Sequence, residues 1–166
     1  MKRSCFLSLI LCVGAFAQGD TVVRWSGIEG VITAPGIDNP VSGIHSGTSP
    51  WTTRNGNAKI NLATGEGSFE VEGLVLNGGN VTGTPGPITS VVGTLVCNVG
   101  STMGPAEAII DTPAASLSRL GDAELSFKIN VPPACSNPVF LLRIPQFGLR
   151  WIATGTSPAS NSKSSY

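Results

Sequence analysis

The chain is poor in the residues on which most active sites depend. Its 166 residues include a single histidine, four cysteines and only 12% charged side chains. A Ser-His-Asp hydrolase would have to use His45, whose neighbour Ser46 is badly placed as a nucleophile because adjacent side chains diverge, and no GxSxG turn is present. No cluster of zinc, copper or calcium ligands is visible either. We therefore expect no catalytic residue, no metal and no cofactor, and a protein that is not an enzyme.

Charge of either sign is also scarce, with ten Lys and Arg balanced by ten Asp and Glu. No basic patch is present that could neutralise phosphates, which argues against nucleic acid as a partner. Beyond the first 17 residues no apolar run approaches the roughly 20 residues that a membrane-spanning helix needs. The mature chain is therefore expected to have no membrane span.

The first 17 residues have the pattern of a secretory signal. Lys2 and Arg3 precede an apolar stretch over residues 4–16, and Ala15 and Ala17 provide the small residues that precede a cleavage site. Cleavage would leave a chain that begins at Gln18. We therefore expect a secreted protein, either periplasmic or extracellular.

Two cysteines, Cys97 and Cys135, remain after this segment. In an exported protein such a pair is expected to form a disulfide. A redox-active pair would need CxxC spacing, and a zinc site would need further ligands. The sequence therefore predicts one structural disulfide.

The composition favours short strands and frequent turns. Glycine (21) and proline (12) are abundant, and valine, isoleucine and threonine are common, which disfavours helices. We expect an all-β, single-domain antiparallel sandwich of about seven or eight strands over residues 18–156, with a small β-barrel as the alternative. The Ser-rich residues 157–166 are expected to be a disordered tail.

A hairpin is predicted around the pair Thr64-Gly65. Apolar and polar residues alternate on both sides of this pair. A two-residue turn would place Ile60 opposite Phe69 on one face and Lys59 opposite Glu70 on the other.

Further strands follow from the apolar pattern. Residues 122–131 alternate with period two, which is typical of a half-buried antiparallel strand. Residues 22–33 (with a bend or bulge at their glycines), 88–99, 106–111, 139–144 and 149–156 are also expected to be strands, and residues 77–87 a loop. One short helix is predicted over residues 112–120, because Thr112 could cap it, Pro113 suits its first turn and Gly121 would end it.

The most suggestive segment for function is the polar stretch 41–57. We expect it to be a long loop in which Trp51, with Arg54 and His45 close by in sequence, can stack on a sugar ring, while arginine and asparagine side chains bind hydroxyl groups. The alternative is that Trp51 folds back and closes the end of the sandwich. On this basis the candidate ligand-binding residues are His45, Trp51 and Arg54, and the candidate partner is a polysaccharide or another surface protein.

Two other functions remain open at this stage. Exposed strand edges could pair with another chain, which would make the protein a self-assembling or protein-binding module. A pair of carboxylates could run a hydrolase reaction, but Glu70, Glu72, Asp122 and Glu124 are all expected on solvent-facing sides of their strands. The sequence leaves the oligomeric state, and glycosylation of the Asn80 sequon, undetermined.

Overall fold

The computed structural model describes residues 21–34, 36–100 and 107–156. Within them only a short 3₁₀ turn, η1 (Pro145–Phe147), is helical, so the predicted all-β class is confirmed. The predicted signal segment 1–17 and the predicted tail 157–166 lie outside the described residues. The strands are β1 (Val22–Trp25), β2 (Gly27–Gly30), β3 (Trp51–Thr52), β4 (Asn55–Asn61), β5 (Glu66–Glu72), β6 (Val75–Leu76), β7 (Ser90–Cys97), β8 (Ala108–Ser116), β9 (Ala123–Lys128), β10 (Val139–Ile144) and β11 (Arg150–Thr156).

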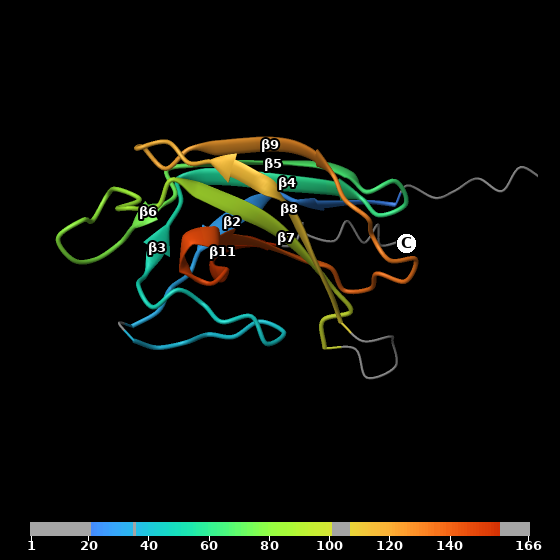
Figure 1. Cartoon of the computed structure of the whole chain (residues 1–166), viewed down its shortest axis with the longest axis horizontal. Coiled ribbons are helices and arrows are strands. Elements are labelled where there is room, and N and C mark those ends of the chain that lie inside the picture. The colour runs from blue at the N-terminus through green and yellow to red at the C-terminus, as the bar shows by residue number, and fades with distance from the viewer. Residues whose placement is uncertain (1–20, 35, 101–106, 157–166) are drawn as a thin grey trace, which may run out of the picture.

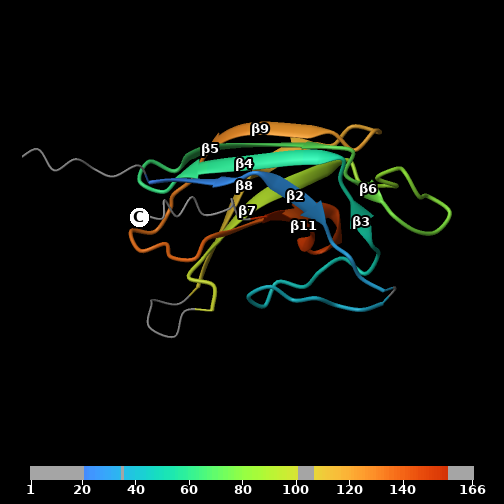
Figure 2. The same cartoon turned by 180° about the vertical axis from the view of Figure 1, so that it is seen from behind.

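Two antiparallel sheets lie one above the other, as Figure 1 and the reverse view in Figure 2 show. The four-stranded sheet has the order β1-β4-β5-β9, and the five-stranded sheet has the order β2-β11-β10-β7-β8. A short ladder of β3 with β6 lies at one end of the two layers. The described fold is therefore a sandwich.

The predicted bend in the first strand is a passage between the two sheets. β1 pairs with β4 in one sheet, and β2 pairs with β11 in the other. Only Ser26 separates β1 from β2. One short stretch of chain thus belongs to both layers and joins them covalently.

The core between the sheets is centred on aromatic rings. Phe140 of β10 packs 5.6 Å from the Trp25 ring and 5.7 Å from the Phe69 ring, measured between centroids. Phe127 of β9 lies 6.3 Å from Phe69. Gly93 of β7 leaves room for this contact, because a Cβ there would come within 2.9 Å of the Phe140 ring. In β9, Phe127 and Ala123 alternate with the exposed residues Glu124 and Ser126, as the sequence pattern predicts.

The predicted hairpin forms, as β4 and β5, but its predicted register is wrong by two residues. Phe69 faces Ala58 instead of Ile60, and Lys59 does not face Glu70. Because side chains alternate with period two, a shift of two leaves every side chain on its predicted face.

Local turn chemistry explains the shift. The hairpin loop spans residues 62–65, and the Asn61 carboxamide oxygen accepts hydrogen bonds from the amides of Ala63 and Thr64. Gly65, at φ 73°, then returns the chain and donates its amide to the Asn61 carbonyl. The two-residue turn would have needed positive φ at Thr64, which a β-branched residue disfavours.

The predicted helix over residues 112–120 is wrong, because most of this segment belongs to β8. β8 is an edge strand, and its register with β7 shifts where Gly93 faces Thr112 and Pro113. The Gly93 amide donates to the Thr112 hydroxyl at this bulge. An edge strand with a bulge tolerates a proline that has no N–H to donate. The threonine and proline that resemble a helix start are therefore the residues of a β-bulge.

The other strand predictions are confirmed in position. Residues 123–128 form β9, residues 90–97 form β7, and β10 is the middle strand of its sheet. The predicted disulfide joins Cys97, at the end of β7, to Cys135 in the connection that precedes β10. The Asn98 carboxamide supports this junction through hydrogen bonds with Ala134 and Ser136.

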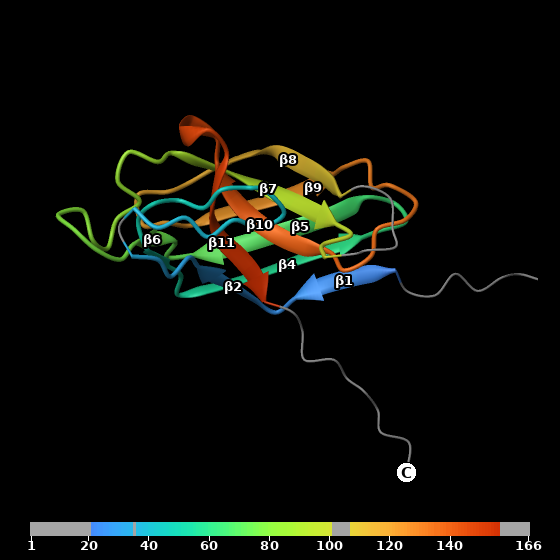
Figure 3. The ribbon, with the colours of Figure 1, turned by 90° about the horizontal axis from the view of Figure 1, so that it is seen from below.

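Residues 36–50 cross the outer side of the five-stranded sheet, as Figure 3 shows from below. The Trp151 amide donates to the His45 carbonyl, and the Gly47 amide donates to the Trp151 carbonyl at 2.7 Å. The Trp151 indole N–H donates to the Asn39 carbonyl. Through these bonds residues 36–50, hereafter the covering segment, are attached to the start of β11.

A buried polar cluster lies on the same side of this sheet. The Arg143 Nη1 atom is 2.9 Å from the Asp111 Oδ1 atom, and its Nε donates to the Leu149 carbonyl. The Thr94 hydroxyl donates to the same Asp111 oxygen. These partners satisfy an arginine that is only 8% exposed, as a buried charge requires.

Candidate functional site

Trp51 was predicted to lie in a loop, but it lies in the short strand β3. Its amide donates to the Val31 carbonyl, and its Cα partner across the ladder is Leu76. The side chain is 4% exposed. The indole therefore closes the end of the sandwich and presents only a small part of its surface to ligands.

That small part forms the floor of a depression of about 440 Å³, hereafter the Trp51 pocket. Such a volume lies within the range of small-ligand sites. Apolar side chains form most of its wall, and Phe147 of the 3₁₀ turn, which is 54% exposed, stands at its rim. The pocket is lined by Gly47, Thr48, Ser49, Trp51, Leu76, Pro87, Ile88, Ile144, Phe147 and Arg150.

The Trp51 pocket is lined by few polar side chains, and the one that is charged is positive. They are the hydroxyls of Thr48 and Ser49 and the guanidinium of Arg150, and no carboxylate lines the pocket. The Arg150 Nη1 atom donates to the Ser46 carbonyl at 2.8 Å. The covering segment thus orients the arginine of the pocket.

His45 lies outside this pocket, in the covering segment. Its side chain is 65% exposed, and its Nδ1 is 2.5 Å from Asp38 Oδ2. The other Asp38 oxygen accepts the Ser46 amide at 2.8 Å. The Ser46 hydroxyl is buried against Asp38, Asn39 and Gly47, so it is not directed at the histidine. Asp38 fixes the bend of the covering segment.

The environment of Asp38 favours its ionised form. The His45 imidazole, followed by the Ser46 backbone amide, lowers the pKa of the Asp38 carboxyl below its ordinary value. A carboxyl whose pKa is lowered by folding stabilises the folded state above its unfolded pKa, about 3.9, and loses this effect as the pH falls through the folded pKa. The covering segment is therefore expected to loosen in acid.

We expect Asp38→Asn to speed hydrogen exchange at the Ser46 and Gly47 amides above pH 5, because a neutral carboxamide accepts more weakly than a carboxylate from the Ser46 amide and the His45 ring. The difference in melting temperature between the variant and the parent should shrink from pH 5 towards pH 2, where protonation weakens the same bonds in the parent. Glu29→Gln, which changes an exposed carboxylate of β2, is the control. A difference that stays constant over this range would contradict the role of Asp38.

Arg54 lies apart from both other candidates, immediately before β4. Its Nη2 is 3.3 Å from Glu72 and 3.9 Å from Asp122. It lines a separate depression on the side of the four-stranded sheet. The three residues predicted as one binding site, His45, Trp51 and Arg54, are therefore placed on three different parts of the surface.

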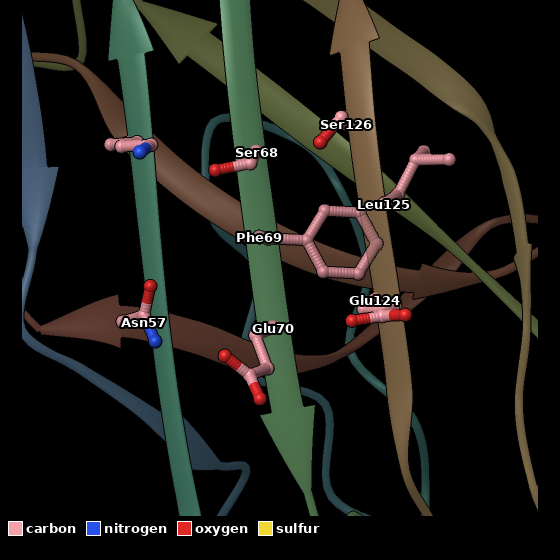
Figure 4. Close-up of a pocket in the computed structure, with 8 residues that line it drawn as sticks. Asn57, Ser68, Phe69, Glu70, Glu124, Leu125 and Ser126 are labelled. Atoms are coloured by element: carbon pink, nitrogen blue, oxygen red, sulfur yellow. The ribbon is translucent and has the colours of Figure 1, made fainter.

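Two of the carboxylates considered for hydrolysis, Glu70 and Glu124, line a depression on the outer face of the four-stranded sheet. Glu70 of β5 and Glu124 of β9 face each other across the ladder, and Figure 4 shows them beside Asn57, Ser68 and Ser126. Both glutamates are exposed. Like charges in directly opposite positions repel one another, but their exposure to water screens this repulsion.

Sequence reasoning missed two residues of the Trp51 pocket, Phe147 and Arg150. The signal was an aromatic residue in the turn Pro145–Phe147, a position where polar residues are usual. The sequence alone does not show that this turn lies at the same end of the sandwich as Trp51, so the aromatic residue could not be assigned to the pocket.

In the described part of the chain, no group of three or more His, Cys, Asp or Glu side chains could hold a metal ion. No helix among these residues is long and apolar enough to cross a membrane. Comparison with family models, with curated proteins and with solved structures finds no match to this chain.

Proposed function

We propose that this protein is a secreted, non-enzymatic binding module that holds a polysaccharide chain in the Trp51 pocket. One observation carries the proposal: this pocket has an apolar floor at Trp51 and a half-exposed aromatic ring, Phe147, at its rim. The C–H face of a sugar ring packs on such a surface, because aromatic rings remove its apolar area from water without losing much side-chain entropy.

Hydroxyl groups near the apolar floor can form hydrogen bonds with the hydroxyl groups of a sugar ring. Thr48 and Ser49 line the pocket next to Trp51, and each hydroxyl can both donate and accept a hydrogen bond. Ligand sites commonly combine an apolar wall with a few polar groups that fix the orientation of the ligand.

A location outside the cell is supported by the disulfide between Cys97 and Cys135. Disulfides persist in oxidising compartments and are rare in the reducing cytosol. The signal-like pattern of residues 1–17 agrees with this location.

A role other than catalysis is supported by the positions and partners of the polar side chains that were considered as catalytic residues. Asp38, His45 and Ser46 bond to one another within the covering segment, and Glu70 and Glu124 are exposed on the outer face of the four-stranded sheet. A catalytic carboxylic acid usually needs burial or a charged neighbour to adjust its pKa.

We expect Phe147→Ala to weaken polysaccharide binding at least tenfold in a binding screen or by calorimetry, because the ring supplies the exposed part of the apolar wall. Phe147 is more informative than Trp51, since truncating the buried indole would also destabilise the fold. Ile109→Ala removes a side chain that is 47% exposed on β8, away from the pocket, and should leave binding unchanged. Equal affinity of the Phe147 variant and the parent would exclude this pocket as the site.

A further inference from the structure

A second depression adjoins the Trp51 pocket. It has a volume of about 390 Å³ and shares Ile88 with the first. A hydrogen bond also links the two: the Gln146 carboxamide of the 3₁₀ turn donates to the Thr89 hydroxyl, and Thr89 lines the second depression. The second depression is lined by Thr84, Pro85, Gly86, Ile88, Thr89, Leu117, Ser118 and Arg119.

The two depressions meet at Ile88 and are hereafter together called the end groove. Residues 77–87 and the turn between β8 and β9 lie at the same end of the sandwich as β3 and β6 (Figure 1). The end groove thus includes Phe147 and Arg150 in the first depression and Arg119 in the second. It offers room for more than one sugar ring of a linear chain.

The end groove lacks the carboxylates that line three other depressions of the described residues. Neither of its depressions is lined by an aspartate or a glutamate, whereas each contains one arginine. Each of the three depressions on the four-stranded sheet includes at least one carboxylate, among them Glu66 and Glu70. The groove is thus cationic although the whole chain has equal numbers of acidic and basic residues.

The two arginines have donors to spare. Arg150 uses one Nη1 hydrogen bond on the Ser46 carbonyl, and a guanidinium has five N–H donors. Neither Arg150 nor Arg119 forms an ion pair with the residues that the structure describes. A guanidinium of this kind binds a carboxylate through two parallel hydrogen bonds.

We infer that the end groove binds an acidic polysaccharide whose sugar rings carry carboxylates, with Arg150 and Arg119 each binding a carboxylate. This inference rests on the proposed function, and it adds the charge and the length of the ligand. The apolar wall between the arginines packs against sugar rings, and the absence of carboxylates in the groove removes repulsion. Nucleic acid is a poorer fit, because two arginines neutralise few phosphates of a densely charged chain.

The test compares polygalacturonate with the same polymer after methyl esterification, which removes the charge and preserves the backbone. The parent is expected to bind the acidic polymer at least tenfold more tightly than its ester, and this preference should shrink as salt is raised. Arg150→Gln should lose tenfold in affinity for the acidic polymer and Arg119→Gln at least threefold, while binding of the ester changes little in both variants.

Two further variants keep the test specific. Arg150→Lys retains the charge but not the paired hydrogen bonds, so it should fall between the parent and Arg150→Gln, and it guards against a loosened covering segment. Arg24→Gln removes an exposed arginine of the four-stranded sheet and should bind like the parent. Thermal melts check that each variant is folded.

The outcomes separate the two proposals. Equal binding of polymer and ester, abolished by Phe147→Ala, would keep the proposed function and overturn the inference about charge. Loss of affinity in Arg24→Gln equal to that in Arg150→Gln would show general attraction to charge and also overturn it. No effect of Arg119→Gln would overturn the two-depression groove. Binding to no polysaccharide would overturn both proposals.

Discussion

Replacing Phe140 by alanine is expected to lower the free energy of unfolding by about 4 kcal/mol. Phe140 is fully buried and belongs to the five-stranded sheet, while its ring packs against Trp25 and Phe69 of the four-stranded sheet. Truncation removes the contact that joins the layers and leaves a cavity that rigid strands on both sides cannot fill.

The measurement is urea unfolding followed by tryptophan fluorescence, with the denaturant slope compared between variants. Phe140→Leu keeps most of the volume and should cost clearly less. Ile109→Ala, on an exposed part of β8, should change stability by less than about 0.5 kcal/mol. A loss below about 2 kcal/mol for Phe140→Ala would mean that the two sheets do not depend on this contact.

Removing the disulfide is the second large effect. The bond joins residues that are 38 apart in sequence, and closing a loop of this length stabilises a protein by about 4 kcal/mol in the loop-entropy treatment. We expect the double variant Cys97→Ala/Cys135→Ala to melt roughly 10–20 °C below the parent. The hydrogen bonds of Asn98 to Ala134 and Ser136 would then still join the two segments that the disulfide links in the parent.

Reduction provides the matched control for this experiment. A reducing agent should lower the melting temperature of the parent towards that of the double variant and leave the double variant unchanged. If reduction had no effect on the parent while the double variant was still destabilised, the loss would come from packing around Cys97, which is fully buried, and not from the cross-link.

The strands that the sequence predicts best are those whose side chains alternate between core and water. Residues 123–128 illustrate this, since Ala123 and Phe127 are buried while Glu124 and Ser126 are exposed. The continuous apolar run of β10 was also recognisable, because a central strand is covered on both faces. Its middle position in the five-stranded sheet confirms this reasoning.

The errors arose where a local pattern fits two structures. Thr112 and Pro113 would start a helix, but they also suit a bulge on an edge strand, and only pairing with Gly93 of β7 decides between the two. In the hairpin, apolar alternation is unchanged by a shift of two residues, so the register depended on the Asn61 side chain. Neither choice is encoded in the periodicity on which the prediction relied.

The candidate site depended on contacts between distant parts of the chain. Trp51 was recognised as a residue that could either bind sugar or close the sandwich, and its burial favours the second role. Phe147, in the turn after β10, and Arg150, the first residue of β11, line the same pocket. No spacing rule links residue 51 to residue 147, because the link is made by the packing of strands from both sheets.

The passage of the chain between the sheets at Ser26 also sets an order for folding. The β4–β5 hairpin can form from residues that are close in sequence. In contrast, β2 pairs with β11, so Gly30 can be paired only after Ala153 has been synthesised and brought to it. Contacts between such distant residues slow folding, because the entropy of closing a long loop is lost before the contacts can stabilise the chain. The earliest part of the sandwich to emerge during synthesis is therefore among the last to be completed.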